Sequence, residues 1–250
     1  MQVYTIDFEG IYTEQSWYLT RKDKIKNMDI IPYEGTNGYC SQKSCEVLQA
    51  YCSNLDFPAV TYLGSGNYHY LTYFLLQQIK KPFSMVMFDF HSDIQMGMCK
   101  ELLSCGNWVR FALENCSQLK QVYIVGVAEQ YIPKDYDCCG KEVHFITEKQ
   151  VRSIDWIEEV KRGIQYPIYI TIDKDVFREG TVYTNWDQGT MEINDVSAFF
   201  EGVRARHKIL GGDICGECSK NYADGQYNRY QEVNGIINQQ ILTYFHMANR

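Results

Sequence analysis

The chain alternates between short apolar runs and longer stretches with helical spacing. The apolar runs are rich in β-branched and aromatic residues, which is typical of buried strands. They predict strands at Gln2–Phe8, Ala59–Leu63, Ser84–Phe90, Gln121–Val127, Glu142–Ile146, Pro167–Ile172 and Lys208–Ile214. Apolar residues at helical spacing predict helices at Tyr70–Ile79, Trp108–Leu113, Val151–Val160, Val196–Val203 and Tyr230–Met247. Near-continuous apolar strands that alternate with helices indicate an α/β fold with a parallel sheet covered on both faces.

The organisation along the chain indicates one domain, residues 1–250. We find no internal repeat, no low-complexity tract and no linker rich in proline and glycine, and the five prolines do not cluster. The segment 12–54 contains turn-like sequence and predicts no clear helix or strand. A chain of this length buries roughly 70–75% of the surface that it exposes when unfolded, so we expect it to fold without disulfides.

The composition excludes several classes of function. The net charge of −7 argues against a nucleic-acid partner, because phosphate binding needs a basic face. No apolar run reaches the roughly 20 residues of a membrane span, and the first residues lack the basic leader of a signal peptide. We therefore expect a cytoplasmic protein whose ten cysteines are mostly reduced thiols. Only Cys215 and Cys218 form a C-x-x-C pair, which alone is weak support for a zinc site.

Two predicted strands end in acidic residues. The first runs directly into Asp89, His91 and Asp93, which an extended backbone points to one side. The second ends in Asp173 and Asp175, whose like charges repel unless a cation lies between them. Each pattern alone also fits an ordinary strand end, with solvated acids in the first case and a helix cap or turn in the second.

A third strand leads into a glycine-rich turn, Gly64–Gly66, and then to His69 at the start of a helix. A lone histidine there is more often a capping or core residue than a ligand. Because the carboxyl ends of parallel strands meet at one edge of a sheet, however, all three groups are expected to converge. Together they predict a metal site whose ligands are His69, Asp89, His91, Asp93, Asp173 and Asp175.

The charges of this set predict two divalent ions, since four carboxylates carry −4 and two such ions carry +4. Oxygen-rich ligation with two imidazoles suits Mn²⁺ best, with Fe²⁺, Co²⁺ and Zn²⁺ as alternatives. Two metals about 3.5–4 Å apart can share a water and lower its pKa into the neutral range. The resulting hydroxide is a nucleophile for a carbon that is bonded to nitrogen.

These motifs resemble those of the arginase/agmatinase/formiminoglutamase (ureohydrolase) superfamily. Its members carry Gly-Gly-Asp-His-Ser, Asp-Ala-His-x-Asp and Asp-x-Asp-x-x-Asp-Pro, and Gly64–His69, Asp89–Asp93 and Asp173–Asp175 follow in the same order with similar gaps. The resemblance implies a three-layer α/β/α sandwich around a mostly parallel sheet of about eight strands. It also implies a small-molecule substrate, and it allows a homo-oligomer.

The resemblance further implies how the ligands are shared. One metal would be held by His69, Asp89, Asp93 and Asp173, and the other by Asp89, His91, Asp173 and Asp175. Asp93 would also act in catalysis by orienting the bridging hydroxide.

Several positions depart from the family pattern. Tyr68 replaces an aspartate, and the third motif lacks its trailing Asp-Pro. Cys105 stands where the family has a histidine that shuttles protons, and it is either a replacement shuttle or an inert buried thiol. The carboxylate that binds guanidinium in the family corresponds to Glu217, which follows Asp213 with one extra residue between them.

The turn-rich segment after the third motif offers Asn185, Trp186 and Asp187 as residues that line a substrate pocket, or it is only a structural turn. The leading function is hydrolysis of a linear C–N bond in a guanidino or amidino compound by a metal-bridging hydroxide. The alternatives are a deacetylase-like amide hydrolase on the related fold and a metal-binding member that has lost catalysis. Free arginine is not the expected substrate, because Gln95–Leu103 lacks the family's groups for the free amino acid.

Overall fold

The computed structural model describes residues 1–28, 34–96, 101–153, 155–222 and 225–248. Its centre is an eight-stranded sheet in the order β2-β1-β4-β10-β9-β5-β7-β8, and every neighbouring pair of strands is parallel. The strands are β1 (Gln2–Ile6), β2 (Ile25–Met28), β4 (Ala59–Tyr62), β5 (Phe83–Phe88), β7 (Leu119–Val127), β8 (Glu142–Thr147), β9 (Ile168–Asp173) and β10 (Ile209–Cys215).

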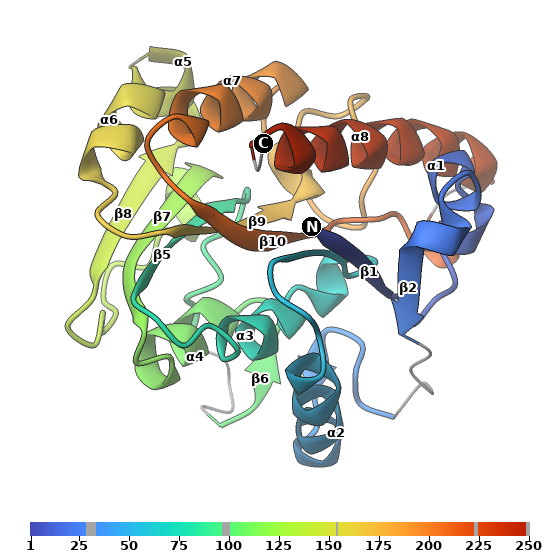
Figure 1. Cartoon of the computed structure of the whole chain (residues 1–250), viewed down its shortest axis with the longest axis horizontal. Coiled ribbons are helices and arrows are strands. Elements are labelled where there is room, and N and C mark those ends of the chain that lie inside the picture. Colours follow the sequence, from blue (N-terminus) through green and yellow to red (C-terminus); the bar gives the residue numbers. More distant parts are fainter. Residues whose placement is uncertain (29–33, 97–100, 154, 223–224, 249–250) are drawn as a thin grey trace.

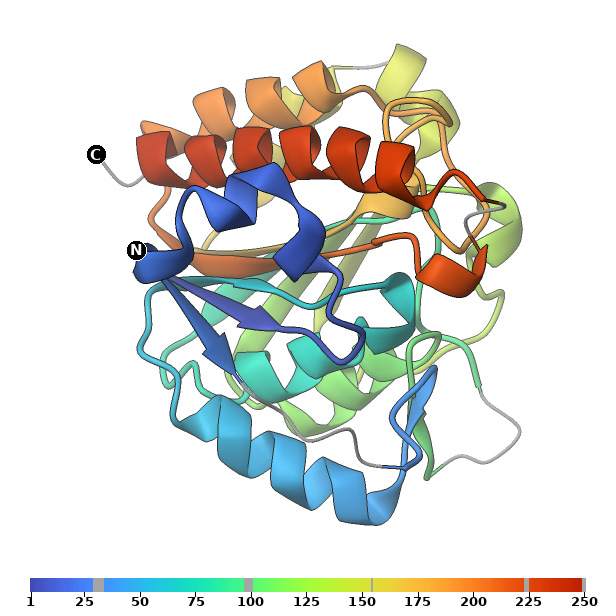
Figure 2. The same ribbon diagram turned by 90° about the vertical axis from the view of Figure 1, so that its right-hand side faces the viewer.

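Helices cover both faces of this sheet, so the molecule has three layers (Figure 1, Figure 2). One layer contains α1 (Ser16–Leu19), α5 (Glu148–Ser153), α6 (Trp156–Gly163), α7 (Ile193–Arg204) and α8 (Tyr227–Ala248). The other contains α2 (Gln42–Ser53), α3 (Leu71–Leu76) and α4 (Trp108–Asn115). The α/β/α sandwich expected from the sequence is confirmed.

Each face of the sheet has its own apolar core. In β5, Val86 and Phe88 belong to the core under α7 and α8, whereas Met85 and Met87 belong to the core above α3 and α4. Successive residues of a strand point to opposite faces, so a strand buried on both sides must be apolar throughout. This requirement explains why the strands could be found as continuous apolar runs.

The segment 12–54 contains structure that the sequence did not predict. It holds β2 at the sheet edge, the helix α2, and the two-residue strand β3 (Tyr39–Cys40). The strand β3 pairs antiparallel with β6 (Leu103–Ser104). Cys105 follows β6 directly, and its backbone N–H donates to the carbonyl of Gly38 at 3.0 Å, so this small sheet fixes the turn that carries Cys105.

The helix predicted at Val151–Val160 is wrong in extent, because the structure has α5 and α6 there instead. The Asp155 side chain accepts a hydrogen bond from the backbone N–H of Glu158 at 3.4 Å. An aspartate in this position begins a new helix, since it satisfies an N–H group that has no partner inside the helix. Among the described residues, no helix has both the length and the hydropathy needed to cross a bilayer.

Gly212 in the central strand β10 allows α8 to pack closely on the sheet. A Cβ atom at this position would lie 2.1 Å from the carbonyl oxygen of Ile170 and 2.5 Å from Cζ of Phe245. We predict that Gly212→Ala lowers the free energy of unfolding by about 3 kcal/mol, because neither the strand nor the helix can move aside cheaply.

Chemical denaturation measures this effect, and Gly140→Ala is the control. Gly140 has a positive φ of 74° but nothing within 4 Å of its added Cβ, so its substitution should cost only about 1 kcal/mol. Equal stabilities of the two variants would contradict the close packing of α8 on β10.

Candidate metal centre

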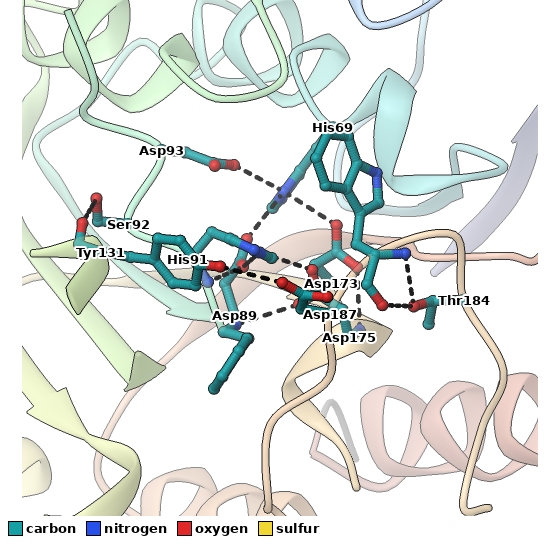
Figure 3. A network of polar contacts seen from close by, with 12 residues as sticks. His69, Asp89, His91, Ser92, Asp93, Tyr131, Asp173, Asp175, Thr184 and Asp187 are labelled. Atoms are coloured by element: carbon teal, nitrogen blue, oxygen red, sulfur yellow. Dashed lines mark hydrogen bonds and ion pairs between the residues drawn. The ribbon is translucent and has the colours of Figure 1, made fainter. Parts of the chain in front are cut away.

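The six predicted metal ligands lie together at the carboxyl ends of the central strands (Figure 3). Asp89 directly follows β5 and Asp173 ends β9, which are neighbours in the sheet, and His69 follows β4 through a short 3₁₀ turn. The Nδ1 atom of His69 lies 3.2 Å from Oδ2 of Asp89, 3.3 Å from Oδ2 of Asp93 and 3.5 Å from Oδ2 of Asp173. Four side chains from three segments thus converge on one point.

A second group of ligands lies next to the first. The Nδ1 atom of His91 is 2.9 Å from Oδ2 of Asp175 and 3.6 Å from Oδ1 of Asp89. Asp89 therefore presents one oxygen to each histidine. Two sets of residues, His69 with Asp89 and Asp93, and His91 with Asp89 and Asp175, bring their ligand atoms within 4.8 Å of one another. These two sets have the donor atoms to hold two adjacent cations that share the carboxylate of Asp89.

Two buried polar atoms in the first group are suited to bind a cation. Nδ1 of His69 and Oδ2 of Asp89 make no hydrogen bond of acceptable geometry, although both residues are only 1% exposed. A buried polar atom without a partner costs about 1–3 kcal/mol. A divalent cation between the two atoms would satisfy both, so the residues present fit such an ion.

Hydrogen bonds behind the cluster orient the ring of His69 toward this point. Nε2 of His69 lies 2.9 Å from Oγ1 of Thr171, whose hydroxyl donates to Oδ1 of Asp213 at 2.6 Å. Thr171 must therefore accept from the Nε2–H of His69, which leaves a lone pair on Nδ1 for a metal. Thr171 was not among the predicted site residues, although its position two residues before Asp173 places both side chains on one face of β9.

A strained backbone conformation and a hydrogen bond from Trp108 hold Asp93 in place. Its φ of 51° lies in the left-handed region, which a residue with a side chain rarely adopts. The indole Nε1–H of Trp108 donates to its Oδ2 at 2.7 Å. The carboxylate of Asp93 is thus turned toward His69 and fixed there, at the cost of backbone strain of about 1–3 kcal/mol, which is typical of functional sites.

A cavity of about 220 Å³ opens onto the cluster. Besides the aspartates and His91, its walls are formed by Gly66, Gln95, Cys105, Gly106 and Trp186. A Cβ atom at Gly66 would lie 2.9 Å from Oδ2 of Asp173 and 3.0 Å from Cδ1 of Trp186. The glycine-rich turn therefore makes room for a metal ligand and for the cavity wall.

Comparison with known proteins agrees with this geometry. Residues 21–225 match the Arginase family. The chain belongs to the arginase family. A Thermotoga maritima protein described as uncharacterized is 33% identical over 219 residues, which are 86% of this chain and 79% of that protein.

Solved structures show the same fold. The agmatine ureohydrolase of Thermoplasma volcanium has a TM-score of 0.70 and 17% identity, and the match covers 99% of this chain and 88% of that one. The formiminoglutamase of Trypanosoma cruzi, described with Mn²⁺, has a TM-score of 0.67 and 11% identity, with 94% and 93% covered.

This arginase-family member departs from the family's motifs at Tyr68 and Cys105, and the two side chains lie in different surroundings. The hydroxyl of Tyr68 donates to Glu9 at 3.1 Å, and its ring stacks on Phe8. Cys105 lines the cavity beside the ligands. Burial, helped by the negative charge of Asp93, raises the pKa of the Cys105 thiol to about 12, so the thiol is neutral in the metal-free protein.

The segment expected to line the substrate pocket contributes one wall residue. Trp186 lines the cavity, is 43% exposed, and donates its Nε1–H to Oδ1 of Asn67 at 2.9 Å. Asn185 instead holds Ser219, donating to its hydroxyl at 2.8 Å and accepting from its backbone N–H at 2.9 Å. The exposed Asp187 accepts a hydrogen bond from the hydroxyl of Tyr131 at 3.2 Å.

Glu217, the expected partner of a guanidinium, lies outside the cavity lining and is completely buried. Its Oε1 accepts from Nζ of Lys174 and from Nδ2 of Asn238 at 2.6 Å. Its Oε2 accepts from Nε2 of Gln15 at 3.0 Å and from Nδ2 of Asn234 at 3.1 Å. Each oxygen already has two donors, so the structure places Glu217 as the counterion of Lys174 and not beside the metal ligands.

This geometry predicts that Glu217→Gln destabilises the fold by about 3–5 kcal/mol, because it leaves the ammonium of Lys174 buried without a counterion. The double variant Lys174→Met/Glu217→Gln should recover most of that loss, since it removes both charges. Denaturation curves of the wild type and both variants measure the effect. A stable Glu217→Gln protein with only a raised KM for a guanidino substrate would instead support the role expected from the sequence.

The metal-free cluster holds extra protons. Burial and the neighbouring Asp175 raise the pKa of Asp173 to about 6, and burial and Asp89 raise that of Asp175 to about 7. Burial opposes protonation of His91, but its hydrogen bonds and charge interactions with Asp175 and Asp89 together outweigh this and raise its pKa to about 12. The folded state therefore binds more protons than the unfolded state from about pH 4 upward, and its stability falls as the pH rises.

We predict that the metal-free protein unfolds at a lower temperature at pH 8 than at pH 5.5, and that Asp175→Asn reduces this difference. A divalent cation replaces these protons, so Mn²⁺ should stabilise the folded protein more at pH 8 than at pH 5.5. At 100 times its Kd, the ion adds about 2.7 kcal/mol to the free energy of unfolding. Thermal unfolding with and without Mn²⁺ at both pH values measures this. Stabilisation by Mn²⁺ that is equal at the two pH values would contradict ligation by these groups.

Proposed function

We propose that this protein is a binuclear metal-dependent hydrolase that cleaves a linear C–N bond in a small guanidino or amidino compound. The observation that carries the proposal is the pair of unsatisfied buried atoms, Nδ1 of His69 and Oδ2 of Asp89, which face each other 3.2 Å apart beside an open cavity. Similar solved structures support the substrate class, since they include an agmatine ureohydrolase and a formiminoglutamase with Mn²⁺.

We assign the residues to two coordination sets that share Asp89, one oxygen of which faces each histidine, and also Asp173, as the family resemblance implies. One ion would be held by His69, Asp89, Asp93 and Asp173, and the other by Asp89, His91, Asp173 and Asp175. We propose Mn²⁺ for both, since the donors are mostly carboxylate oxygens with two imidazoles. When bound, two such ions provide a hydroxide nucleophile near neutral pH and polarise the substrate.

The chain's own groups have three tasks in this scheme. Asp93, fixed by Trp108, orients the nucleophile, and its rigid position lowers the reorganisation needed during the reaction. Trp186 forms a wall of the cavity and limits the access of water. Cys105 donates a proton to the leaving nitrogen, provided that the charge of bound cations lowers the pKa of its thiol from about 12 toward the working pH.

One observation favours a second candidate, hydrolysis of a neutral amide. Within the described residues, the carboxylates that line the cavity are Asp89, Asp93, Asp173 and Asp175, all of which are metal ligands in the scheme above. Glu217 is neutralised by Lys174, so it offers no charge to a guanidinium cation. A substrate without a positive charge at the reacting carbon would need no such partner.

We predict that the Mn²⁺-loaded protein releases urea or an amine from one or more compounds in a panel of guanidines, amidines and N-acyl amines. Asp89→Ala should abolish turnover and reduce the bound metal, which elemental analysis measures, because it removes a ligand of both ions. Asp56→Asn is the matched control, since this exposed carboxylate contacts Lys26 and Tyr4 at the other end of the sheet, away from the cavity.

The three functions give different results in that assay. Urea or amine release from guanidines or amidines supports the proposal, and release only from N-acyl amines supports the amide hydrolase. A protein that binds two ions but turns over no member of the panel is the non-catalytic alternative, and a protein that binds none contradicts the metal centre.

For Cys105 we predict that Cys105→Ser lowers kcat by about 10²-fold while the metal content stays unchanged, because serine is a much weaker acid. Cys105→His should retain turnover, since imidazole can carry the same proton. Steady-state kinetics over a range of pH measure both variants, with Cys138→Ser, outside the cavity lining, as the control. Wild-type kcat in Cys105→Ser would show that the thiol only packs against the cavity wall.

A further inference from the structure

Cys215, the last residue of β10, lies directly beside a metal ligand. In the sheet it is paired with Asp173 of β9, and register partners on neighbouring parallel strands point their side chains to the same face. Its Sγ donates a hydrogen bond to Oδ2 of Asp173 at 3.1 Å, and the residue is completely buried. The functions proposed above give this thiol no role.

A second observation points to a ligand at the same place. Nδ1 of His69 is buried, makes no hydrogen bond, and lies 3.5 Å from the same Oδ2 atom of Asp173. Ligand atoms of His69, Asp173 and Cys215 lie within 4.8 Å of one another. An ion held by Nδ1 of His69 and Oδ2 of Asp173 would therefore have the sulfur of Cys215 within reach.

The backbone after Cys215 is shaped to allow this approach. Gly216 has a φ of 87°, and a Cβ atom there would lie 2.4 Å from Oδ1 of Asp173 and 2.6 Å from the backbone nitrogen of Lys174. Only glycine lets the end of β10 come so close to Asp173. The backbone between Asp213 and Glu217 thus places the carboxylate of Glu217 against Lys174. It also places the sulfur atom of Cys215 beside Asp173.

We propose that Cys215 supplies a thiolate ligand to the ion at His69 and Asp173, so that the two metal positions differ chemically. This inference rests on the proposed metal centre, and it revises the metal that is preferred at one of the two positions. The position with sulfur favours Zn²⁺ or Co²⁺ over Mn²⁺, because thiolate is a softer donor than carboxylate. The position at His91 and Asp175 keeps oxygen and nitrogen donors and accepts Mn²⁺. Metal binding releases the thiol proton to solvent.

Cobalt spectroscopy tests this directly, because sulfur bound to Co²⁺ gives a charge-transfer band in the near ultraviolet that oxygen and nitrogen donors lack. We expect the Co²⁺-loaded full-length protein to show the band. Cys215→Ser should lose it while it retains bound cobalt, and its preference for Zn²⁺ over Mn²⁺ should fall about tenfold or more. Cys105→Ser and Cys218→Ser are the matched controls and should keep the band, since one thiol lines the cavity and the other lies three residues beyond Cys215.

A second measurement tests the inference if Cys215→Ser fails to fold. X-ray absorption of the Zn²⁺-loaded Cys105→Ser protein, which lacks the thiol of the cavity lining, should show a sulfur neighbour at about 2.3 Å. Bound metal without a sulfur neighbour, or a cobalt band that disappears in Cys105→Ser and persists in Cys215→Ser, would overturn the inference but leave the metal centre intact. Failure of the wild type to bind Co²⁺ or Zn²⁺ at all would overturn both.

Discussion

Four carboxylates, those of Asp89, Asp93, Asp173 and Asp175, are buried together at one end of a sheet whose strands are otherwise apolar. Their mutual repulsion is the constraint on which the surrounding structure depends. In the metal-free protein, protons on the aspartates and on His91 relieve it, as the raised pKa values of Asp173, Asp175 and His91 indicate. Two divalent cations would relieve it more completely, because they neutralise the charge and also satisfy the unpaired atoms of His69 and Asp89.

The buried ion pair of Lys174 and Glu217 gives Glu217 a different role from the one that its motif implied. Lys174 lies between two metal ligands in sequence, yet its side chain points away from them to Glu217 and Asn238. The amides of Gln15, Asn234 and Asn238 complete the network and tie the N-terminal segment and α8 to the ends of β9 and β10. The carboxylate expected to recognise a substrate is therefore part of the buried network that joins the ends of β9 and β10 to α8.

The sequence predicted the layers of the fold and the convergence of the six ligands because both follow from local patterns. Apolar strands buried on two faces are continuous, and an acid directly after such a strand lies at the sheet edge. Contacts between distant segments could not be predicted in this way. Lys174 and Glu217 are 43 residues apart, and the amides around them come from both ends of the chain. The edge strand β2 is short and mixed in polarity, so only its pairing with β1 identifies it. The role of Cys105 stays a prediction, because its place in the cavity fits a proton donor and an inert thiol equally.

The proposed metal centre consists of two adjacent cation sites that share Asp89 at the end of the sheet. Anomalous scattering from a crystal of the protein grown with Mn²⁺ tests this arrangement, because it locates each ion relative to the surrounding side chains. We expect two peaks about 3.5–4 Å apart, one beside His69 and Asp93 and one beside His91 and Asp175. A single peak, or ions bound only away from these residues, would contradict it.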